Sequence, residues 1–217
     1  MLKFLLNRFF EKSGKFTNST NYWRDRYEQG GNSGDGSYRN LADFKAEIIN
    51  GFVTEYNVRD IIEYGCGDGN QLRLARYPRY IGFDVSPKAL EICSKIFCGD
   101  ESKTFKLVSD YGGETAELTI SLDVILHLVE DDVFDSYMER LFGSSTRYVI
   151  IYSSNHDSPA SGRTGHVRHR RFTDWIERRY PGWVLVRHIP NRYPFKGDTR
   201  SGSQADFYIY AKNANFA

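Results

Sequence analysis

Short apolar runs alternate with amphipathic segments over most of this chain. Runs rich in β-branched and aromatic residues predict strands at 59–64, 79–84, 104–109, 117–122 and 146–152. Helical spacing of apolar residues predicts helices at about 40–56, 69–76, 87–97, 131–142 and 172–180. Strands that alternate with helices are joined as parallel neighbours, and such sheets bind ligands at the carboxyl ends of their strands. The pattern therefore predicts an α/β protein with a doubly wound, mostly parallel sheet.

The C-terminal part departs from this alternation. Two β-rich runs, at 183–189 and 204–211, follow each other with no helical pattern between them. Directly successive strands of this kind predict an antiparallel hairpin at the edge of the sheet, which brings the expected sheet to seven strands.

The N-terminal part is predicted to be a helical cap. Leu2, Leu5, Leu6 and Phe9 have helical spacing, which predicts a short amphipathic helix at 2–12 that packs on the body or serves as a docking surface. A polar linker is expected at 13–21, and the glycine-rich segment 30–38 is expected to be either a movable lid or a linker. We expect residues 1–57 to form this cap on a core of residues 58–217, within one structural domain.

Composition restricts the expected partners and the cellular compartment of the protein. The 217 residues carry 29 basic and 28 acidic side chains, so no global field draws the chain to nucleic acid or membranes. The cysteines, Cys66, Cys93 and Cys98, form no C-x-x-C pair, which fits a reducing compartment and argues against structural zinc. No apolar run reaches membrane-spanning length, and the start of the chain is a poor signal peptide. A cytoplasmic location without a transmembrane segment is the expectation.

The most informative motif lies at the end of the first predicted strand. Glu63 precedes three alternating glycines, Gly65, Gly67 and Gly69, and Asp84 ends the next strand 19 positions beyond Gly65. Glycines let the backbone turn sharply and approach a ligand, and an ionised Asp can accept hydrogen bonds from both ribose hydroxyls. The spacing is G-x-G-x-G, whereas dinucleotide sites use G-x-G-x-x-G.

This motif resembles motif I, E/D-x-G-x-G-x-G, of the class I S-adenosylmethionine (SAM) methyltransferases, and the order of elements from Arg59 to about Asn213 is similar to the whole core of that family. The resemblance implies SAM as cofactor and S-adenosylhomocysteine (SAH) as product. It implies cofactor-binding roles along the core, to which we add Tyr22 from the N-terminal segment; the core residues are Glu63, Gly65, Cys66, Gly67, Asp84, Val85, Asp110, Tyr111 and Ser121.

Two further segments bear on the acceptor. Residues 117–128 are similar to the family's segment after the fourth strand, but Glu117 replaces the usual Asp and Leu126 replaces a common Glu, which makes the acceptor side less polar. The segment from Tyr22 to Lys45 resembles the N-terminal part of bacterial and viral methyltransferases associated with glycan assembly. That resemblance implies a sugar, nucleotide-sugar or glycan acceptor, and a glycosyltransferase as a candidate partner.

Methyl transfer to a hydroxyl needs a base that takes the proton. His127 is the leading candidate, Asp123 is expected to orient it, and His166 is the alternative base; packing roles remain open for each. Residues 163–171 hold four arginines and two histidines, and Arg168, His169 and Arg170 are predicted to bind an anionic group of the acceptor, together with Tyr38. A solvated basic loop is the alternative.

Neither a nucleic acid nor a metal ion is predicted as a partner. No interleaving of basic and aromatic residues marks a single-strand channel, so no nucleic-acid partner is predicted. Acidic residues and His127 at 123–132 could hold a divalent metal, but a helix N-terminus explains the acids equally well, and no metal is predicted.

The sequence thus predicts a SAM-dependent O-methyltransferase with a sugar-containing acceptor. Two alternatives remain open. One is methylation of another metabolite, a protein or a nucleic acid; the other is a non-catalytic SAM-binding partner subunit.

Overall fold

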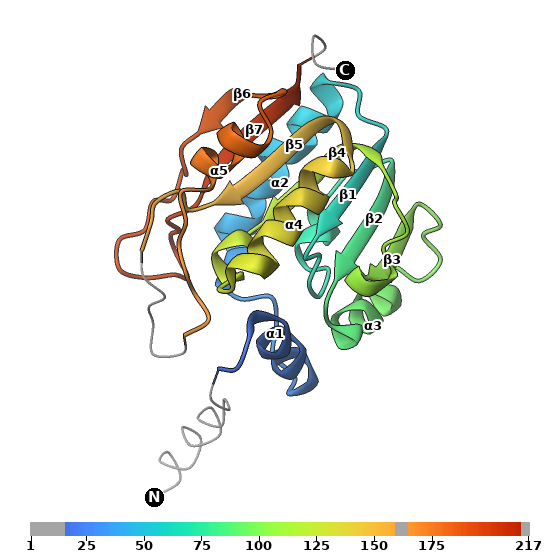
Figure 1. The fold of residues 1–217 in the computed structure, drawn as a ribbon. Helices are drawn as coiled ribbons and strands as arrows, with labels where there is room; N and C mark the ends of the chain where they lie inside the picture. The colour runs from blue at the N-terminus through green and yellow to red at the C-terminus, as the bar shows by residue number, and fades with distance from the viewer. Residues whose placement is uncertain (1–15, 159–164, 214–217) are drawn as a thin grey trace, which may run out of the picture.

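A single seven-stranded sheet forms the centre of the molecule (Figure 1). The computed structural model describes residues 16–158 and 165–213. The strands run in the order β3-β2-β1-β4-β5-β7-β6, and β1 to β5 pair in parallel. Their bounds are β1 Asp60–Tyr64, β2 Arg79–Asp84, β3 Lys103–Leu107, β4 Ala116–Leu122, β5 Ser145–Ser153, β6 Trp183–Ile189 and β7 Asp206–Lys212.

The last two strands form the predicted hairpin. β7 is antiparallel to both β5 and β6, so it is the reversed strand, and β6 lies at the edge. The predicted doubly wound, mostly parallel sheet with an antiparallel C-terminal hairpin is therefore confirmed.

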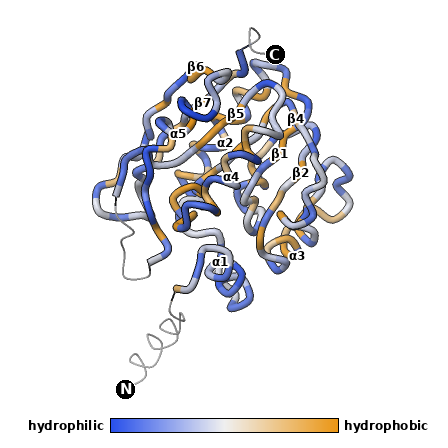
Figure 2. The backbone as a smooth tube through the Cα atoms, viewed as in Figure 1, coloured by the Kyte–Doolittle hydropathy of each residue, from blue (hydrophilic) through white to orange (hydrophobic). Residues whose placement is uncertain are grey.

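Helices cover both faces of the sheet. α2 (Arg39–Glu55) and α3 (Pro87–Ile96) pack on one face, and α4 (Asp131–Gly143) and α5 (Phe172–Arg179) pack on the other. Successive residues of β1 show the division, because Ile61 packs with the α2 layer and Ile62 with the α4 layer. The central strands are accordingly coloured as hydrophobic along much of their length (Figure 2). α2 packs directly on the sheet, and the division into a cap at 1–57 and a core at 58–217 stays a prediction.

α1 (Ser19–Glu28) lies at the carboxyl ends of the parallel strands (Figure 1). Asn18 caps this helix by accepting a hydrogen bond of 2.8 Å from the Asn21 N–H, so the linker expected at 13–21 is wrong at its C-terminal end. The helix expected at 2–12 lies outside the described residues. Among the described residues, none of the helices combines the length and the apolar character that a membrane span needs.

One predicted helix is absent from its place. Instead of a helix at 69–76, the chain forms only a short 3₁₀ turn, η2 (Gln71–Leu74). Gly69 adopts a φ of 74°, which keeps the start of this segment out of the α-helical region, and Pro78 disfavours helical backbone at Tyr77. The apolar residues that gave the helical spacing serve the core here, since Leu72 is buried against it.

Candidate functional site

The glycine turn after β1 is built around Asp84. The N–H groups of Gly65 and Cys66 donate to the carbonyl of Phe83 at 2.7 and 3.1 Å, which ties the turn to the neighbouring strand. The Asp84 carboxylate accepts hydrogen bonds of 2.9 Å from the N–H groups of Gly67 and Ser86. Gly65 must be glycine, because its φ is 84° and a Cβ there would lie 2.5 Å from Val124 Cγ2.

A cavity of about 300 Å³ opens in front of this turn. We call it the glycine-loop cavity; Gly65, Gly67 and Asp84 line its middle. On the side of α4 its lining combines the apolar side chains of Val85, Val108 and Val133 with the polar side chains of Asp132, Ser136 and Arg140. On the side of α2 the lining is polar and consists of Lys45, Glu63, Gln71 and Asp123. The cavity therefore has an end toward α4 where three valines lie among polar side chains, a central carboxylate, and an end toward α2 that we call the charged end.

Glu63 is a buried acid at the charged end. It is 4% exposed, and Tyr80 Oη donates to its carboxylate at 2.5 Å. Burial raises the pKa of Glu63 to about 7, although the Tyr80 hydrogen bond and the positive charge of Lys45 act in the opposite direction. The Glu63 carboxyl is therefore expected to gain or lose its proton near neutral pH.

Lys45 is a buried base that the sequence analysis missed. It lies on the apolar face of α2, its side chain is fully buried, and Nζ pairs with Asp123 Oδ2 at 2.7 Å. Asp123 itself has a φ of 58°, which is uncommon for a residue other than glycine. Asp123, which was expected to orient His127, is instead engaged by Lys45.

The glycine-rich segment between α1 and α2 is ordered and packs on the glycine turn. The Ser33 N–H donates to Asp68 at 3.0 Å, and Ser33 Oγ accepts from the Asp68 N–H at the same distance. Tyr38 Oη also donates to Asp68, at 2.9 Å, and burial together with this bond raises the pKa of Tyr38 to about 12. Tyr38, which was predicted to bind the acceptor, thus holds this segment in place.

α1 covers part of the cavity at the carboxyl ends of the strands (Figure 1). Ser19, the first residue of α1, donates two hydrogen bonds to the Glu130 carboxylate, from its backbone N–H at 3.0 Å and from its hydroxyl at 2.5 Å. On the other side, Arg24 Nε donates to the Val85 carbonyl at 2.9 Å. The helix therefore bridges the segments that follow β2 and β4, with Trp23 lining the cavity beneath it.

A second cavity, of about 450 Å³, adjoins the first. We call it the histidine cavity because His127, His166 and His169 line it. Trp23, Asp123 and His127 line both cavities, so they stand at the junction.

Aromatic contacts hold the histidines at this junction. The ring of His166 stacks on Tyr22 with 4.2 Å between centroids and on His127 with 5.4 Å. Trp23 meets His127 edge-on at 5.0 Å. Tyr22, predicted to bind the cofactor, therefore lines the histidine cavity instead, and Trp23 takes the place beside the glycine-loop cavity.

His127 is held as a neutral base. Its Nδ1 lies 3.1 Å from the carbonyl oxygen of His166, and a carbonyl can only accept, so Nδ1 carries the proton and Nε2 keeps a free lone pair. Burial lowers the pKa of His127, and burial together with the neighbouring His127 lowers the pKa of His166 to about 4. Both imidazoles are neutral at pH 7.

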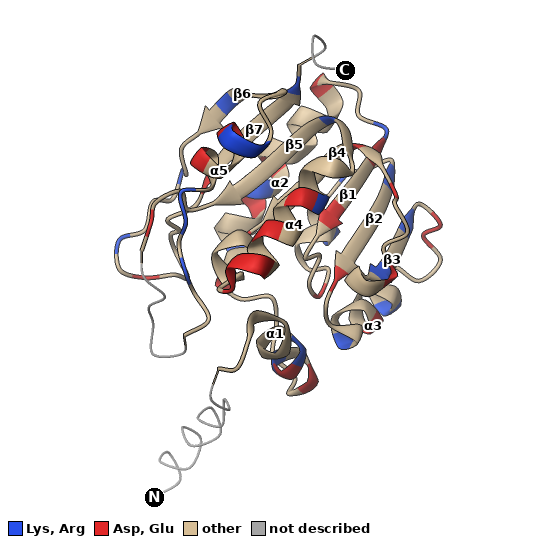
Figure 3. Cartoon of the chain, viewed as in Figure 1, with Lys and Arg blue, Asp and Glu red and all other residues tan. Residues whose placement is uncertain are grey.

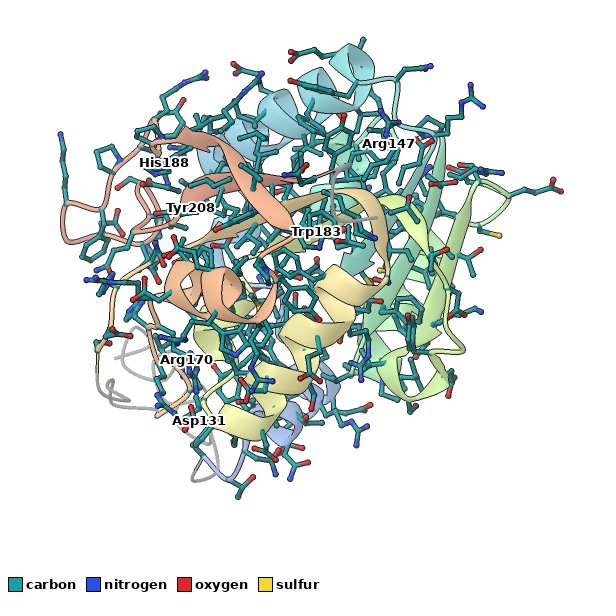
Figure 4. The ribbon with its side chains drawn as sticks, turned by 45° about the horizontal axis from the view of Figure 1, so that its top comes forward. Asp131, Arg147, Arg170, Trp183, His188 and Tyr208 are labelled. Atoms are coloured by element: carbon teal, nitrogen blue, oxygen red, sulfur yellow. The ribbon has the colours of Figure 1, made fainter. Side chains whose placement is uncertain are left out.

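The two predicted anion-binding arginines, Arg168 and Arg170, are not among the residues that line the two cavities. Arg168 and Arg170 bind Asp131 at 2.8 and 2.9 Å, and Arg170 also donates to the carbonyls of Leu128 and Val129. The pair of Arg170 and Asp131 is labelled in Figure 4, beside the start of α4. Acidic residues recur along this helix (Figure 3), which supplies the counter-charge that the sequence analysis did not assign. His169 does line the histidine cavity, where Nδ1 lies 2.6 Å from Ser154 Oγ.

Three predicted cofactor residues also lie outside the lining of the glycine-loop cavity. Asp110 is exposed, and Tyr111 packs against Tyr64 and Phe83. Ser121 is buried with its Oγ 2.7 Å from Tyr137 Oη. Glu63, Gly65, Cys66, Gly67, Asp84 and Val85 are all brought together in the lining.

No cluster of three or more potential ligands suitable for a metal occurs within residues 16–158 and 165–213. Two of the three acids at 130–132 have other partners, since Glu130 accepts hydrogen bonds from Ser19 and Asp131 pairs with two arginines.

Comparison with known proteins relates this fold to one class of enzymes. No family model matches the sequence, and no curated protein sequence matches it. Among solved structures, the methyltransferase domain of bacterial CtHen1-C is 20% identical with a TM-score of 0.64, covering 81% of this chain and 100% of that one. The N-methyltransferase NodS from Bradyrhizobium japonicum WM9, in complex with SAH, is 14% identical with a TM-score of 0.66, covering 91% and 100%. Magnesium protoporphyrin IX methyltransferase from Synechocystis PCC 6803, with bound SAM, is 14% identical with a TM-score of 0.63, covering 93% and 100%.

The chain therefore has the Rossmann-like fold of the SAM-dependent methyltransferases. The acceptors in the names of these structures differ, so the fold alone assigns no acceptor.

Proposed function

We propose that this protein is a SAM-dependent methyltransferase that moves the methyl group of SAM to a hydroxyl of a sugar or glycan. The observation that carries the proposal is the junction of the two cavities, where His127 presents an unprotonated Nε2 and lines both. A cofactor in one cavity and an acceptor in the other would meet at this imidazole.

The residues of the glycine-loop cavity fit SAM. The Asp84 carboxylate has acceptor capacity beyond its backbone hydrogen bonds, which suits a ribose hydroxyl, and the valines on the α4 side suit a flat base. The turn at Gly65 and Gly67 exposes backbone where a side chain would block close approach. Neighbours of the same fold are solved with SAM or SAH.

The chain's own contribution to the reaction is alignment and proton removal. SAM, when bound, supplies an electrophilic methyl group for in-line displacement. Holding the acceptor hydroxyl against it can contribute roughly 7–11 kcal/mol. His127 Nε2 takes the hydroxyl proton during attack, and its neutral state at pH 7 is the form that this step requires.

The lining of the histidine cavity suits the hydroxyl-rich sugar part of an acceptor. Its charged groups are largely engaged within the protein: Arg26 donates to the Asn32 carbonyl at 2.6 Å, and Asp35 accepts from Thr199 at 2.8 Å. The remaining surface combines aromatic rings with neutral hydrogen-bonding groups, including Tyr22 and Ser154. Aromatic faces with a few placed polar groups are the pattern of small-molecule sites and suit a sugar ring.

The test is transfer of label from methyl-labelled SAM to fractionated saccharides and nucleotide sugars, with protein and nucleic-acid fractions in parallel. Label in the saccharide or nucleotide-sugar fractions supports the proposal. Label confined to protein or nucleic acid would contradict the acceptor, and SAM binding with no transfer to any fraction would favour a non-catalytic subunit.

A further inference from the structure

We propose that Lys45 and Gln71 bind the amino-acid end of the cofactor, with Lys45 Nζ on the α-carboxylate and Gln71 Oε1 on the α-ammonium. This inference rests on the proposed function, because it assumes that the glycine-loop cavity takes SAM and SAH. It adds that the cavity selects ligands with a zwitterionic amino-acid tail over the same adenosyl thioether without one.

Lys45 is placed for a ligand at the charged end of the cavity. Its side chain is fully buried and lines the cavity from α2. Burial of an ammonium is costly unless it is paired, and Lys45 has one carboxylate partner, Asp123, at 2.7 Å, and the face of Tyr152 at 5.2 Å. An ammonium has three donors, so it can hold a second carboxylate beside Asp123.

The direction of the cofactor follows from Asp84. With the ribose on this carboxylate and the base on the valines toward α4, the amino-acid tail must extend toward α2. Among the described residues that line the cavity, Lys45 and Arg140 are the lysine and arginine side chains. Arg140 belongs to α4 and lies over the Tyr111 ring at 5.7 Å, so it stands at the opposite end. Lys45 is then the cation available to the carboxylate.

Gln71 provides the complementary group. Within the described part of the chain, its Oε1 is buried and has no hydrogen-bond partner, which is uncommon for a buried polar atom. Its Nε2 donates to the Ala42 carbonyl at 3.1 Å, one helical turn before Lys45, so the amide is fixed beside the same stretch of α2. Gln71 Oε1 can accept a hydrogen bond from the α-ammonium of the ligand while Lys45 Nζ donates to its α-carboxylate.

The experiment compares two ligands on the full chain by calorimetric titration. SAH carries the amino-acid tail, and 5′-methylthioadenosine has the adenosyl thioether without it. We expect Lys45→Met to weaken SAH binding at least about 10-fold and to leave methylthioadenosine binding within about 2-fold of the wild type. Gln71→Leu should weaken SAH binding less and should also spare methylthioadenosine.

Two further variants separate recognition from folding. Lys45→Met/Asp123→Asn removes the carboxylate that the single variant leaves unpaired, and we expect its SAH binding to stay weak. Lys103→Met is the matched control, because Lys103 also pairs with a carboxylate, Asp100, and lies over an aromatic ring, Phe97. Its binding of both ligands should be unchanged.

Each result decides the inference. Equal losses of SAH and methylthioadenosine in Lys45→Met, or recovery of SAH binding in the double variant, would overturn it and leave Lys45 as a partner of Asp123 alone. Wild-type protein that binds neither ligand would overturn the proposed function itself, and with it this inference.

Discussion

His127 Nδ1 lies 3.1 Å from the main-chain carbonyl oxygen of His166, and this contact fixes which nitrogen of His127 can accept a proton. Because a carbonyl accepts only, the Nδ1 proton is committed and Nε2 is the basic atom at the junction of the two cavities. The stacked ring of His166, 5.4 Å away between centroids, holds the imidazole in that orientation.

Replacement of His127 tests its assignment as the base. We expect His127→Asn to lower kcat by at least about 100-fold, because no base then takes the proton of the attacking hydroxyl. The affinity for SAH should change by less than about 3-fold. His188→Asn is the matched control, since His188 lies far along the sheet on the edge strand β6 and pairs with Asp206. Equal kcat values for wild type and His127→Asn would show that another group takes the proton.

The pH dependence of kcat has a definite sign. Burial lowers the pKa of His127, so the imidazole stays neutral at pH values where a free histidine is protonated. We expect kcat to be flat from pH 7 to 8 and to fall only below the ordinary histidine value of about 6.5. A kcat profile with an apparent pKa above 7 would contradict this environment for the base.

Glu63 should make SAM binding depend on pH more than SAH binding does. Burial raises its pKa to about 7 in the free protein, and the positive sulfonium of SAM favours the ionised carboxylate. SAM affinity should therefore rise as pH increases from about 5 to 7 and be flat above that, because binding releases the proton in this window. SAH lacks the sulfonium charge and should show a shallower rise.

The control for this linkage is Glu63→Gln, which keeps the shape of the side chain and cannot ionise. Its SAM and SAH affinities should vary with pH in the same way. If they already do so in the wild type, Glu63 does not sense the cofactor's charge.

A pair of glycine variants separates backbone strain from blocked access. Gly65 and Gly99 have φ values of 84° and 85°, but a Cβ on Gly65 meets Val124 Cγ2 at 2.5 Å, whereas Gly99 has nothing within 4 Å. Gly99→Ala should cost about 1 kcal/mol of stability through strain and leave SAH binding intact. Gly65→Ala carries the same strain and should also abolish SAH binding; comparable SAH affinities in the two variants would contradict this view of the turn.

Local patterns were sufficient to predict the sheet. The strand at Asp60–Tyr64 is a short β-rich segment that ends in a glycine turn, and such a pattern depends only on neighbours in sequence. The glycine motif and Asp84 were found in the same way, because both follow directly from strand ends. The helix prediction for 69–76 was wrong because the spacing of its apolar residues does not reveal the positive φ at Gly69.

The missed residues depend on partners far away in sequence. Lys45 looks like an ordinary helix residue until α2 packs on the sheet and brings it to Asp123, 78 positions later. Arg170 looked like an anion-binding residue because its partner, Asp131, lies 39 positions earlier. The one local signal that could have marked Lys45 was a lysine at a position of the helix stripe where the other residues are apolar.

The most direct measurement of the central claim, that the glycine-loop cavity binds SAM, is a calorimetric titration of the full chain with SAH. We expect saturable one-to-one binding by the wild type, weakened at least about 100-fold in Asp84→Ala, which loses both the ribose acceptor and the anchor of Gly67. Absence of SAH binding by the folded wild type, or undiminished binding by Asp84→Ala, would contradict it.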